Sequence, residues 1–162
     1  MPLAPLLALV LWTYHPASDV IMHRYGVAGW ILEMRTDSFA GRIECSVYRG
    51  RVSYERQALV FHLPGSVDTF DAAYRIDGGR TYLSRDDAED IAAQGFVLRD
   101  DDLDNPSGGL VRIPSVRLEG AKLVQIQPRP NIKPILFRLD GLGAAVAAAR
   151  QLGCNVIGST GR

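Results

Sequence analysis

Short runs in which apolar and polar side chains alternate constrain this chain more than any other feature of its sequence. The clearest run covers residues 42–48, where Ile43, Cys45 and Val47 alternate with polar neighbours. This is the period of a β-strand that turns one face toward a core. Comparable runs recur along the chain and are separated by glycine, proline and aspartate. The sequence therefore predicts a chain of short strands joined by turns.

About eight such strands fall between Trp30 and Leu139, and few helical patterns separate them. Asp77-Gly78-Gly79 tolerates positive φ angles and predicts a tight hairpin between two of the strands. The run 54–63 is expected to form one strand. Strands joined mostly by turns favour antiparallel pairing over a parallel βαβ arrangement. We therefore predict a mainly β (β-rich α+β) fold, an antiparallel sandwich or open barrel with one central and one C-terminal helix.

Both helices have sequence signals at their ends. Ser84 and Asp87 have the spacing of a capping box, which predicts a helix of about ten residues after Ser84. Asp140 stands at a suitable N-cap position for a helix over residues 141–152, and Gly153 at a suitable end. The alanines of this second helix would let it lie close to a sheet.

The chain has two cysteines, Cys45 and Cys154, separated by 109 positions. Cys45 faces the core in the alternation of its strand, and Cys154 follows the predicted C-terminal helix. One disulfide in an oxidising compartment would account for the pair. Two unrelated buried thiols are the alternative.

The N-terminal residues bear on location. Residues 3–12 are apolar, too few to span a bilayer, and resemble the core of a secretory signal with Ala17 as a cleavage residue. A misassigned start codon or an ordinary buried strand would also explain them, and residues 18–26 form a polar lead-in. We predict a signal peptide or N-terminal apolar segment over residues 1–17, one β-rich domain over 27–154 and a tail over 155–162. The expected location is periplasmic or secreted.

Net charge excludes some partners. The chain has 162 residues with 18 basic and 18 acidic side chains, so its formal charge is zero. This gives no general electrostatic basis for binding nucleic acid or an anionic membrane. Residues 84–104 nevertheless carry eight acidic against two basic residues, and residues 105–162 carry eight basic against two acidic. The imbalance indicates either two solvated faces or a polar surface for a charged partner.

No catalytic residues stand out. Of the three histidines only His62 lies within the predicted domain, in an apolar strand. There is no Gly-x-Ser-x-Gly motif, and a core-facing Cys45 would be a poor nucleophile because burial raises a thiol pKa. A small hydrolase that uses aspartates, together with His62, is the enzymatic alternative.

The acidic loop after residue 99 suggests a weak calcium site. Asp100, Asp102 and Asp104 match the first three ligand positions of an EF-hand, but Asn105 and Val111 replace the glycine and the bidentate glutamate. A solvated acidic loop is the more economical interpretation. No clustered His or Cys indicates zinc, and no cofactor is expected.

Tyrosines offer a candidate binding patch. Tyr48, Tyr54, Tyr74 and Tyr82 all lie on predicted strands. If several shared one exposed face they would form a surface for a ligand or a protein. Packing at sheet rims and in the core is the alternative.

Several features together resemble small exported bacterial proteins of the invasion-associated locus B type. These are Trp30, the strand with Cys45, the turn at Ile76-Asp77-Gly78, and the C-terminal strand and helix ending at Cys154. The similarity covers roughly residues 30–154. It implies a single β-rich periplasmic or surface domain with a structural disulfide, no cofactor and no established chemistry.

The resulting expectation is a non-enzymatic exported domain that binds a protein or a cell-envelope component. The hydrolase described above is one alternative. A structural subunit of an envelope assembly is the other.

Overall fold

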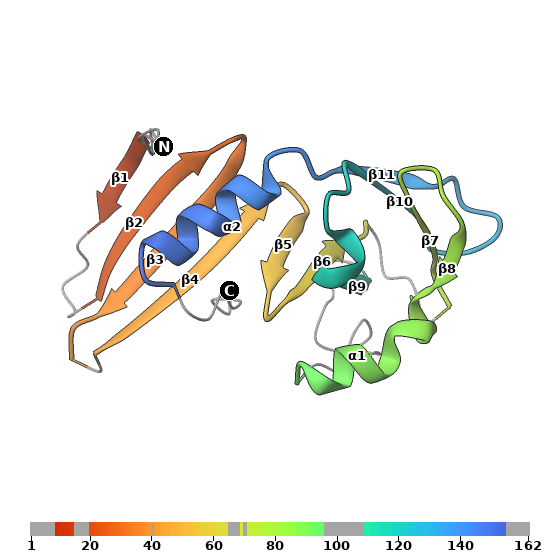
Figure 1. Cartoon of the computed structure of the whole chain (residues 1–162), viewed down its shortest axis with the longest axis horizontal. Coiled ribbons are helices and arrows are strands. Elements are labelled where there is room, and N and C mark those ends of the chain that lie inside the picture. Colours follow the sequence, from red (N-terminus) through yellow and green to blue (C-terminus); the bar gives the residue numbers. More distant parts are fainter. Residues whose placement is uncertain are drawn as a thin grey trace, which may run out of the picture. The chain divides into compact units, whose positions relative to one another are not determined.

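A computed structural model describes residues 9–14, 20–39, 41–64, 69, 71–95 and 109–154, with the backbone alone for 9–14. The chain divides into two compact units (Figure 1). Unit 1 combines the residues up to Arg49 with those from Gly141 onward, and unit 2 is Gly50–Asp140. The single domain predicted over residues 27–154 stays a prediction.

The predicted fold class is confirmed. In the part of the chain that the structure describes, the fold is mainly β, the strands pair antiparallel in two open sheets, and there are two short α-helices, one central and one C-terminal. There are more strands than the eight or so expected. The additional strands come from the N-terminal region and from a turn that the sequence did not signal.

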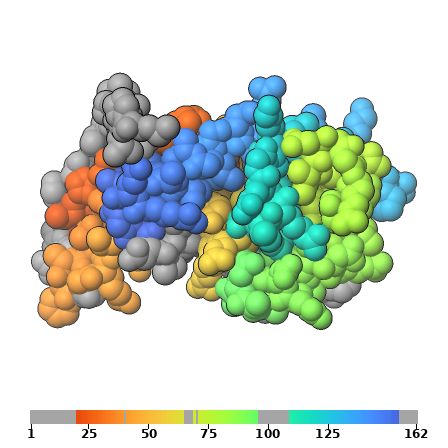
Figure 2. Space-filling model, in the orientation of Figure 1, coloured from red at the N-terminus to blue at the C-terminus, as the bar shows by residue number. Residues whose placement is uncertain are grey.

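Unit 1 is an antiparallel set of strands with a helix across one face. Each strand pairs with the next in the chain: β1 (Leu9–Tyr14), β2 (Val20–Val27), β3 (Trp30–Asp37) and β4 (Arg42–Arg49). Helix α2 (Leu142–Gln151) contacts β2, β3 and β4, and in Figure 2 its atoms, in blue, lie over these strands, in orange. Small side chains on its buried side, including Ala145 and Ala149, let it approach the sheet closely.

The N-terminal strands correct one expectation. The polar lead-in expected over residues 18–26 is instead largely strand β2, which pairs along its whole length with β3. Most of its described side chains are half-buried, so they lack the clear alternation that marks β4. Within the apolar N-terminal run, Leu9–Tyr14 forms strand β1, which pairs with β2.

Unit 2 contains two antiparallel strand sets. One set is β5 (Val52–Glu55), β6 (Ala58–His62) and β9 (Leu110–Pro114). The other is a four-stranded sheet in the order β11 (Ile135–Arg138), β10 (Leu123–Gln127), β7 (Ala73–Ile76) and β8 (Thr81–Leu83). Phe61 of the first set meets Phe137 of the second edge to face, with ring centres 5.1 Å apart. The core of unit 2 therefore lies between the two sets.

Short helical segments complete unit 2. The 3₁₀ turn η1 (Ser84–Asp87) leads directly into α1 (Ala88–Ala93), and a second turn η2 (Ser115–Leu118) connects β9 to β10. Gly95 follows α1 with φ +79°, the left-handed conformation that is common just after a helix. The apolar run Phe96-Val97-Leu98 predicts a further short strand, which lies outside the described residues.

Turn geometry explains one confirmed and one missed hairpin. Asp77 and Gly78 have φ angles of 48° and 73°, as the predicted tight turn requires. The single strand predicted over residues 54–63 is wrong, because a turn at Arg56 and Gln57, with φ of 44° and 68°, divides it into β5 and β6. Neither residue is a usual turn former, which is why the sequence did not reveal it.

The ends of α2 show how the C-terminal segment is placed. Its N-cap is Gly141 rather than the predicted Asp140, with a left-handed φ of 81°. A Cβ at Gly141 would lie 2.3 Å from the carbonyl oxygen of Ala28. At the other end the N–H of Gly153 donates to the carbonyl of Arg150 at 3.1 Å, and the N–H of Cys154 to that of Ala149 at 3.0 Å.

These two hydrogen bonds form a Schellman motif, and Gly153 supplies its left-handed residue at φ +87°. The motif ends the helix after Gln151 and is followed by Cys154, which forms a disulfide with Cys45. The Cα atoms are 5.9 Å apart, within the usual range. The predicted disulfide is thereby confirmed.

We expect the double variant Cys45→Ala, Cys154→Ala to unfold more easily than the oxidised protein. The crosslink closes a loop of 109 positions. For a loop of that size, restriction of the unfolded chain contributes about 4 to 5 kcal/mol in the chain-entropy model. Urea unfolding of the variant and of the oxidised and reduced wild type measures the difference. A loss below about 1 kcal/mol would contradict the expectation.

Gly141→Ala should also destabilise the fold, by more than about 1 kcal/mol, because it combines a left-handed backbone with a steric conflict at Ala28. Gly143→Ala is the matched control. It lies inside α2, and a Cβ there meets no atom within 4 Å. Alanine should stabilise this exposed helical position slightly. Thermal unfolding of both variants tests the contrast, and equal effects would contradict it.

Candidate functional site

The four-stranded sheet of unit 2 has two chemically different faces. Along β10, Val124 and Ile126 are fully buried, whereas Leu123, Gln125 and Gln127 are partly accessible on the other side. Pairing with β7 places Arg75 beside Gln125, so the polar side chains of neighbouring strands share this side. We call it the outer face; the opposite, inner face packs into the core.

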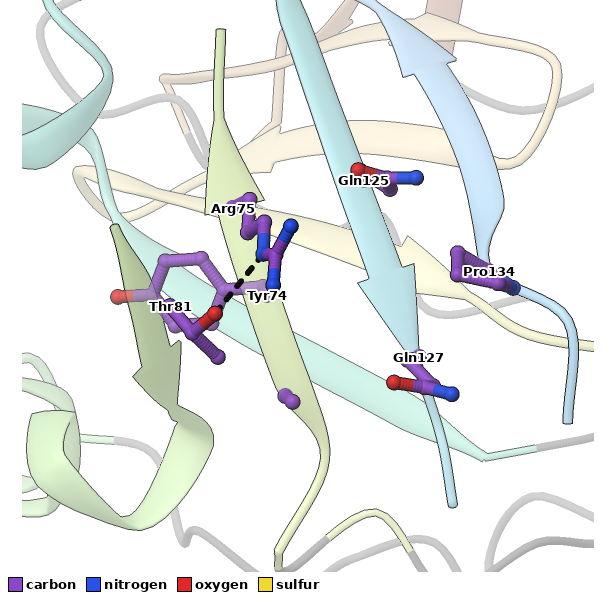
Figure 3. Close-up of a pocket in the computed structure, with 7 residues that line it drawn as sticks. Tyr74, Arg75, Thr81, Gln125, Gln127 and Pro134 are labelled. Carbon is purple, nitrogen blue, oxygen red and sulfur yellow. Dashed lines mark hydrogen bonds between the residues drawn. The ribbon is translucent and has the colours of Figure 1, made fainter. Parts of the chain in front are cut away.

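A hollow of about 150 Å³ opens on the outer face (Figure 3). Strands β7, β8 and β10 and the residue before β11 line it: Ala73, Tyr74, Arg75, Thr81, Gln125, Gln127 and Pro134. A volume of this size accommodates a group no larger than a benzene ring. The hollow thus suits one side chain or one small functional group of a larger partner.

Hydrogen bonds orient the polar groups around the hollow. Arg75 donates from Nε to Oγ1 of Thr81 at 2.8 Å (Figure 3). Gln127 donates from Nε2 to the carbonyls of Pro130 at 2.9 Å and Ile132 at 3.1 Å. These two bonds assign the amide orientation of Gln127 and hold the loop that precedes β11. Both side chains are therefore held in position by groups of the protein itself.

The outer face carries basic but no acidic side chains on its four described strands. Arg75 and Arg138 are both exposed, as are Arg129 and Lys133 in the loop before β11. Two carboxylates near this face, Asp71 and Asp77, each accept a hydrogen bond from another part of unit 2. Asp71 accepts from Arg85 at 2.9 Å, and Asp77 accepts from the backbone N–H of Leu123 at 2.8 Å.

Behind the hollow, a polar cluster lies on the inner face. Tyr74 donates its hydroxyl to Oδ2 of the fully buried Asp87 at 2.6 Å. Nε of Arg117 lies 2.5 Å from Oδ1 of Asp87 and forms an ion pair with it. The geometry of this contact does not meet the criteria for a hydrogen bond. The Tyr82 ring stacks on Tyr74 at 5.2 Å, and the guanidinium groups of Arg80 and Arg117 lie over it at 4.5 and 5.3 Å.

Burial shifts two pKa values in this cluster. Desolvation raises the pKa of Asp87 above its ordinary value, although Tyr74 and Arg117 oppose the shift. Burial, followed by the hydrogen bond to Asp87, raises the pKa of Tyr74 well above its ordinary value. Because Asp87 is fully buried, it serves to hold η1 and η2 against β7 rather than to meet a ligand.

The capping box predicted at Ser84 and Asp87 is wrong, because the Asp87 side chain is buried in the polar cluster and does not cap the helix. Ser84 donates its hydroxyl to the carbonyl of Thr69 at 2.7 Å, while Asp87 turns inward. Asp86 instead accepts from the backbone N–H of Leu83 at 3.2 Å. Since β8 is the last strand of its sheet, this contact occupies a group that could otherwise pair with another strand.

The predicted tyrosine patch is only partly accessible. Tyr54 and Tyr74 are buried, at 7% and 1% exposure, which leaves Tyr48 and Tyr82 with half-buried side chains. The structure brings Tyr74 and Tyr82 together as a stacked pair. Tyr48 belongs to unit 1, where its hydroxyl lies 3.4 Å from Oε2 of Glu33.

Glu33 forms a second buried polar cluster, in unit 1. Its Oε2 lies 2.6 Å from Nε of Arg24, and the side chain of Glu33 is 8% exposed. Hydrogen bonding to Glu33 raises the pKa of Arg24. The cluster balances a buried carboxylate with a guanidinium group.

The other predicted site residues give less information. Asp100, Asp102 and Asp104, the calcium candidates, lie outside the described residues. His62 is exposed at the end of β6. In the described part of the chain no group of three or more His, Cys, Asp or Glu side chains could hold a metal ion. The same residues include no helix long and apolar enough to cross a membrane.

Sequence reasoning missed Arg75, Gln125 and Gln127. The period-two pattern already placed the two glutamines on one side of their strand. Nothing local showed that β7 would pair with β10 and bring Arg75 beside them.

No protein-family model, curated protein or solved structure matches this chain. The resemblance to the invasion-associated locus B type stays a prediction.

We expect Tyr74→Phe to change how stability depends on pH. In the folded wild type the raised pKa keeps Tyr74 neutral, whereas in the unfolded chain it ionises near pH 10. The unfolded state therefore binds fewer protons above about pH 10, and the unfolding free energy falls by up to about 1.4 kcal/mol per pH unit. The variant lacks this contribution. At neutral pH it should lose about 1 to 3 kcal/mol, because the buried Asp87 loses a donor.

Urea unfolding at several pH values measures both effects. As a control, the ultraviolet absorbance of phenolate should rise equally in the wild type and the variant until alkaline unfolding begins. An extra phenolate signal from the folded wild type would show that Tyr74 titrates normally and would contradict the prediction.

Proposed function

We propose that this chain is a binding domain that works in an oxidising compartment outside the cytoplasm. It contacts a protein or a cell-envelope component through the outer face of the four-stranded sheet. The observation that carries the proposal is the open hollow on that face, lined by hydrogen-bonding side chains and a cation.

The disulfide supports the location. Cys45 and Cys154 are both 1% exposed and are bonded to each other. Structural disulfides form and persist in secreted and periplasmic proteins, whereas cytosolic reductants keep most thiols reduced.

The composition of the hollow favours binding over catalysis. General acid or base chemistry needs a titratable group within reach of the substrate. Asp87 and Tyr74, whose pKa values are raised, are buried and meet each other on the inner face. The described lining of the hollow offers guanidinium, hydroxyl and amide groups, which recognise a ligand by charge and hydrogen bonding.

Photo-crosslinking in cells of the source organism tests the proposal. A photoreactive amino acid replaces Leu136, which lies on the outer face next to Gln125 and is 61% exposed. The matched control replaces Val116, an exposed apolar residue of the same unit, at 67%, which lies in η2 outside the sheet. We expect an adduct with an envelope component or exported protein from position 136 and none from position 116.

Equal adducts from both positions, or none from position 136, would contradict the proposal. An adduct between two copies of the chain would instead favour a structural subunit. Maleimide labelling of the denatured protein from the same cells reports the thiol state, and free Cys45 and Cys154 would contradict the proposed location.

A further inference from the structure

We infer that the outer face binds an extended acidic peptide of a partner protein, with one carboxylate side chain seated in the hollow against Arg75. This inference rests on the proposed function and specifies the chemistry of the partner.

The geometry of Arg75 supports a carboxylate in the hollow. Its Nε bond to Thr81 restrains the orientation of the guanidinium group. Within the described residues no acceptor is bonded to Nη1 or Nη2, and the side chain is exposed. Two parallel N–H groups on one guanidinium edge match the two oxygens of a carboxylate. The hollow of about 150 Å³ has room for the end of an aspartate or glutamate side chain.

The charge of the surrounding surface also selects an acidic partner. Arg129, Lys133 and Arg138 are exposed around the same face, and its described strand positions bear no carboxylate. Asp77, at the end of β7, is occupied by backbone N–H groups of Lys122 and Leu123. An acidic segment on this face would thus meet several cations, and the nearby carboxylates Asp71 and Asp77 already have partners. Such complementarity mainly raises association rate and specificity.

The spacing on β10 favours an extended polypeptide. Gln125 and Gln127 project from the same side of one strand, two residues apart, and therefore repeat about every 6.7 Å. A peptide in an extended conformation repeats its side chains at the same interval. The Gln125 amide can both donate to and accept from peptide backbone groups, and the oxygen of Gln127, whose amide N–H groups are already bonded, can accept from them. A glutamine row beside a cation therefore suits a strand with acidic residues at alternate positions.

The side chains of the outer face argue against a sugar polymer as the partner. Pyranose rings commonly stack on exposed aromatic side chains. The described strand positions of this face carry none, because Tyr74 and Tyr82 stack with each other on the inner side. Leu136 instead offers an exposed apolar contact next to Gln125, which suits an apolar peptide side chain.

Binding of the purified, oxidised protein to labelled probes tests the inference by fluorescence anisotropy. The first probe is a short peptide in which glutamate alternates with threonine, and the second replaces each glutamate by glutamine. Polygalacturonate, added as competitor, represents an acidic sugar polymer. The variants are Arg75→Gln and the matched control Arg51→Gln, which changes an exposed arginine of the same unit that does not line the hollow.

We expect the glutamate peptide to bind at least about ten-fold more tightly than the glutamine peptide, as a charge-assisted hydrogen bond allows. Arg75→Gln should remove this preference and leave the circular dichroism spectrum unchanged. Arg51→Gln should keep it.

Equal affinity for the two peptides would overturn the inference. Equal effects of the two arginine variants on binding would also overturn the inference. The same holds if polygalacturonate displaces the labelled peptide at a lower concentration of carboxylate groups than unlabelled glutamate peptide requires. If the crosslink from position 136 forms while the glutamate peptide does not bind, the acidic-peptide inference fails and the proposed function stands. If neither the crosslink from position 136 nor binding of the glutamate peptide is seen, the inference and the proposed function both fail.

Discussion

The disulfide between Cys45 and Cys154 is the constraint on which unit 1 depends, because it joins strand β4 to the end of a helix that comes from the far end of the chain. Helix α2 buries mainly alanines, which offer little apolar area per residue. Its position therefore relies on its two ends. Gly141 permits the close approach to Ala28 at the start, and the Schellman motif at Gly153 directs Cys154 into the crosslink at the end.

Unit 2 is held by a different interaction, the buried contact of Asp87 with Tyr74 and Arg117. Removing a carboxylate from water costs free energy unless partners replace its hydration, and here a phenol and a guanidinium group do so. The network ties η1 and η2 to strand β7. Since Arg75 follows Tyr74 on that strand, the residue proposed to meet a ligand stands on a backbone that is fixed from behind. Preorganisation of this kind lowers the entropic cost of binding.

Charge distribution connects these observations to function. The basic excess of residues 105–162 is visible in the sequence, and the structure places part of it, Arg129, Lys133 and Arg138, around the exposed sheet. Of the two interpretations left open for that imbalance, a polar surface for a charged partner is the one on which our proposals build. In our proposal the hollow gives one carboxylate a specific position, which a uniformly solvated face would not provide.

The sequence by itself determined the features whose causes are local. Alternation marked β4 and the inward direction of Cys45, the Asp77-Gly78 pair marked a hairpin, and Gly153 marked a helix end. Only the tertiary structure decided which tyrosines are buried. It decided as well that Gly141, rather than Asp140, is the N-cap of α2. It also decided that Arg75 lies beside Gln125, residues far apart in the chain. Strand pairing depends on long-range contacts that no local pattern encodes, so a face shared by distant strands appears only once the chain is folded.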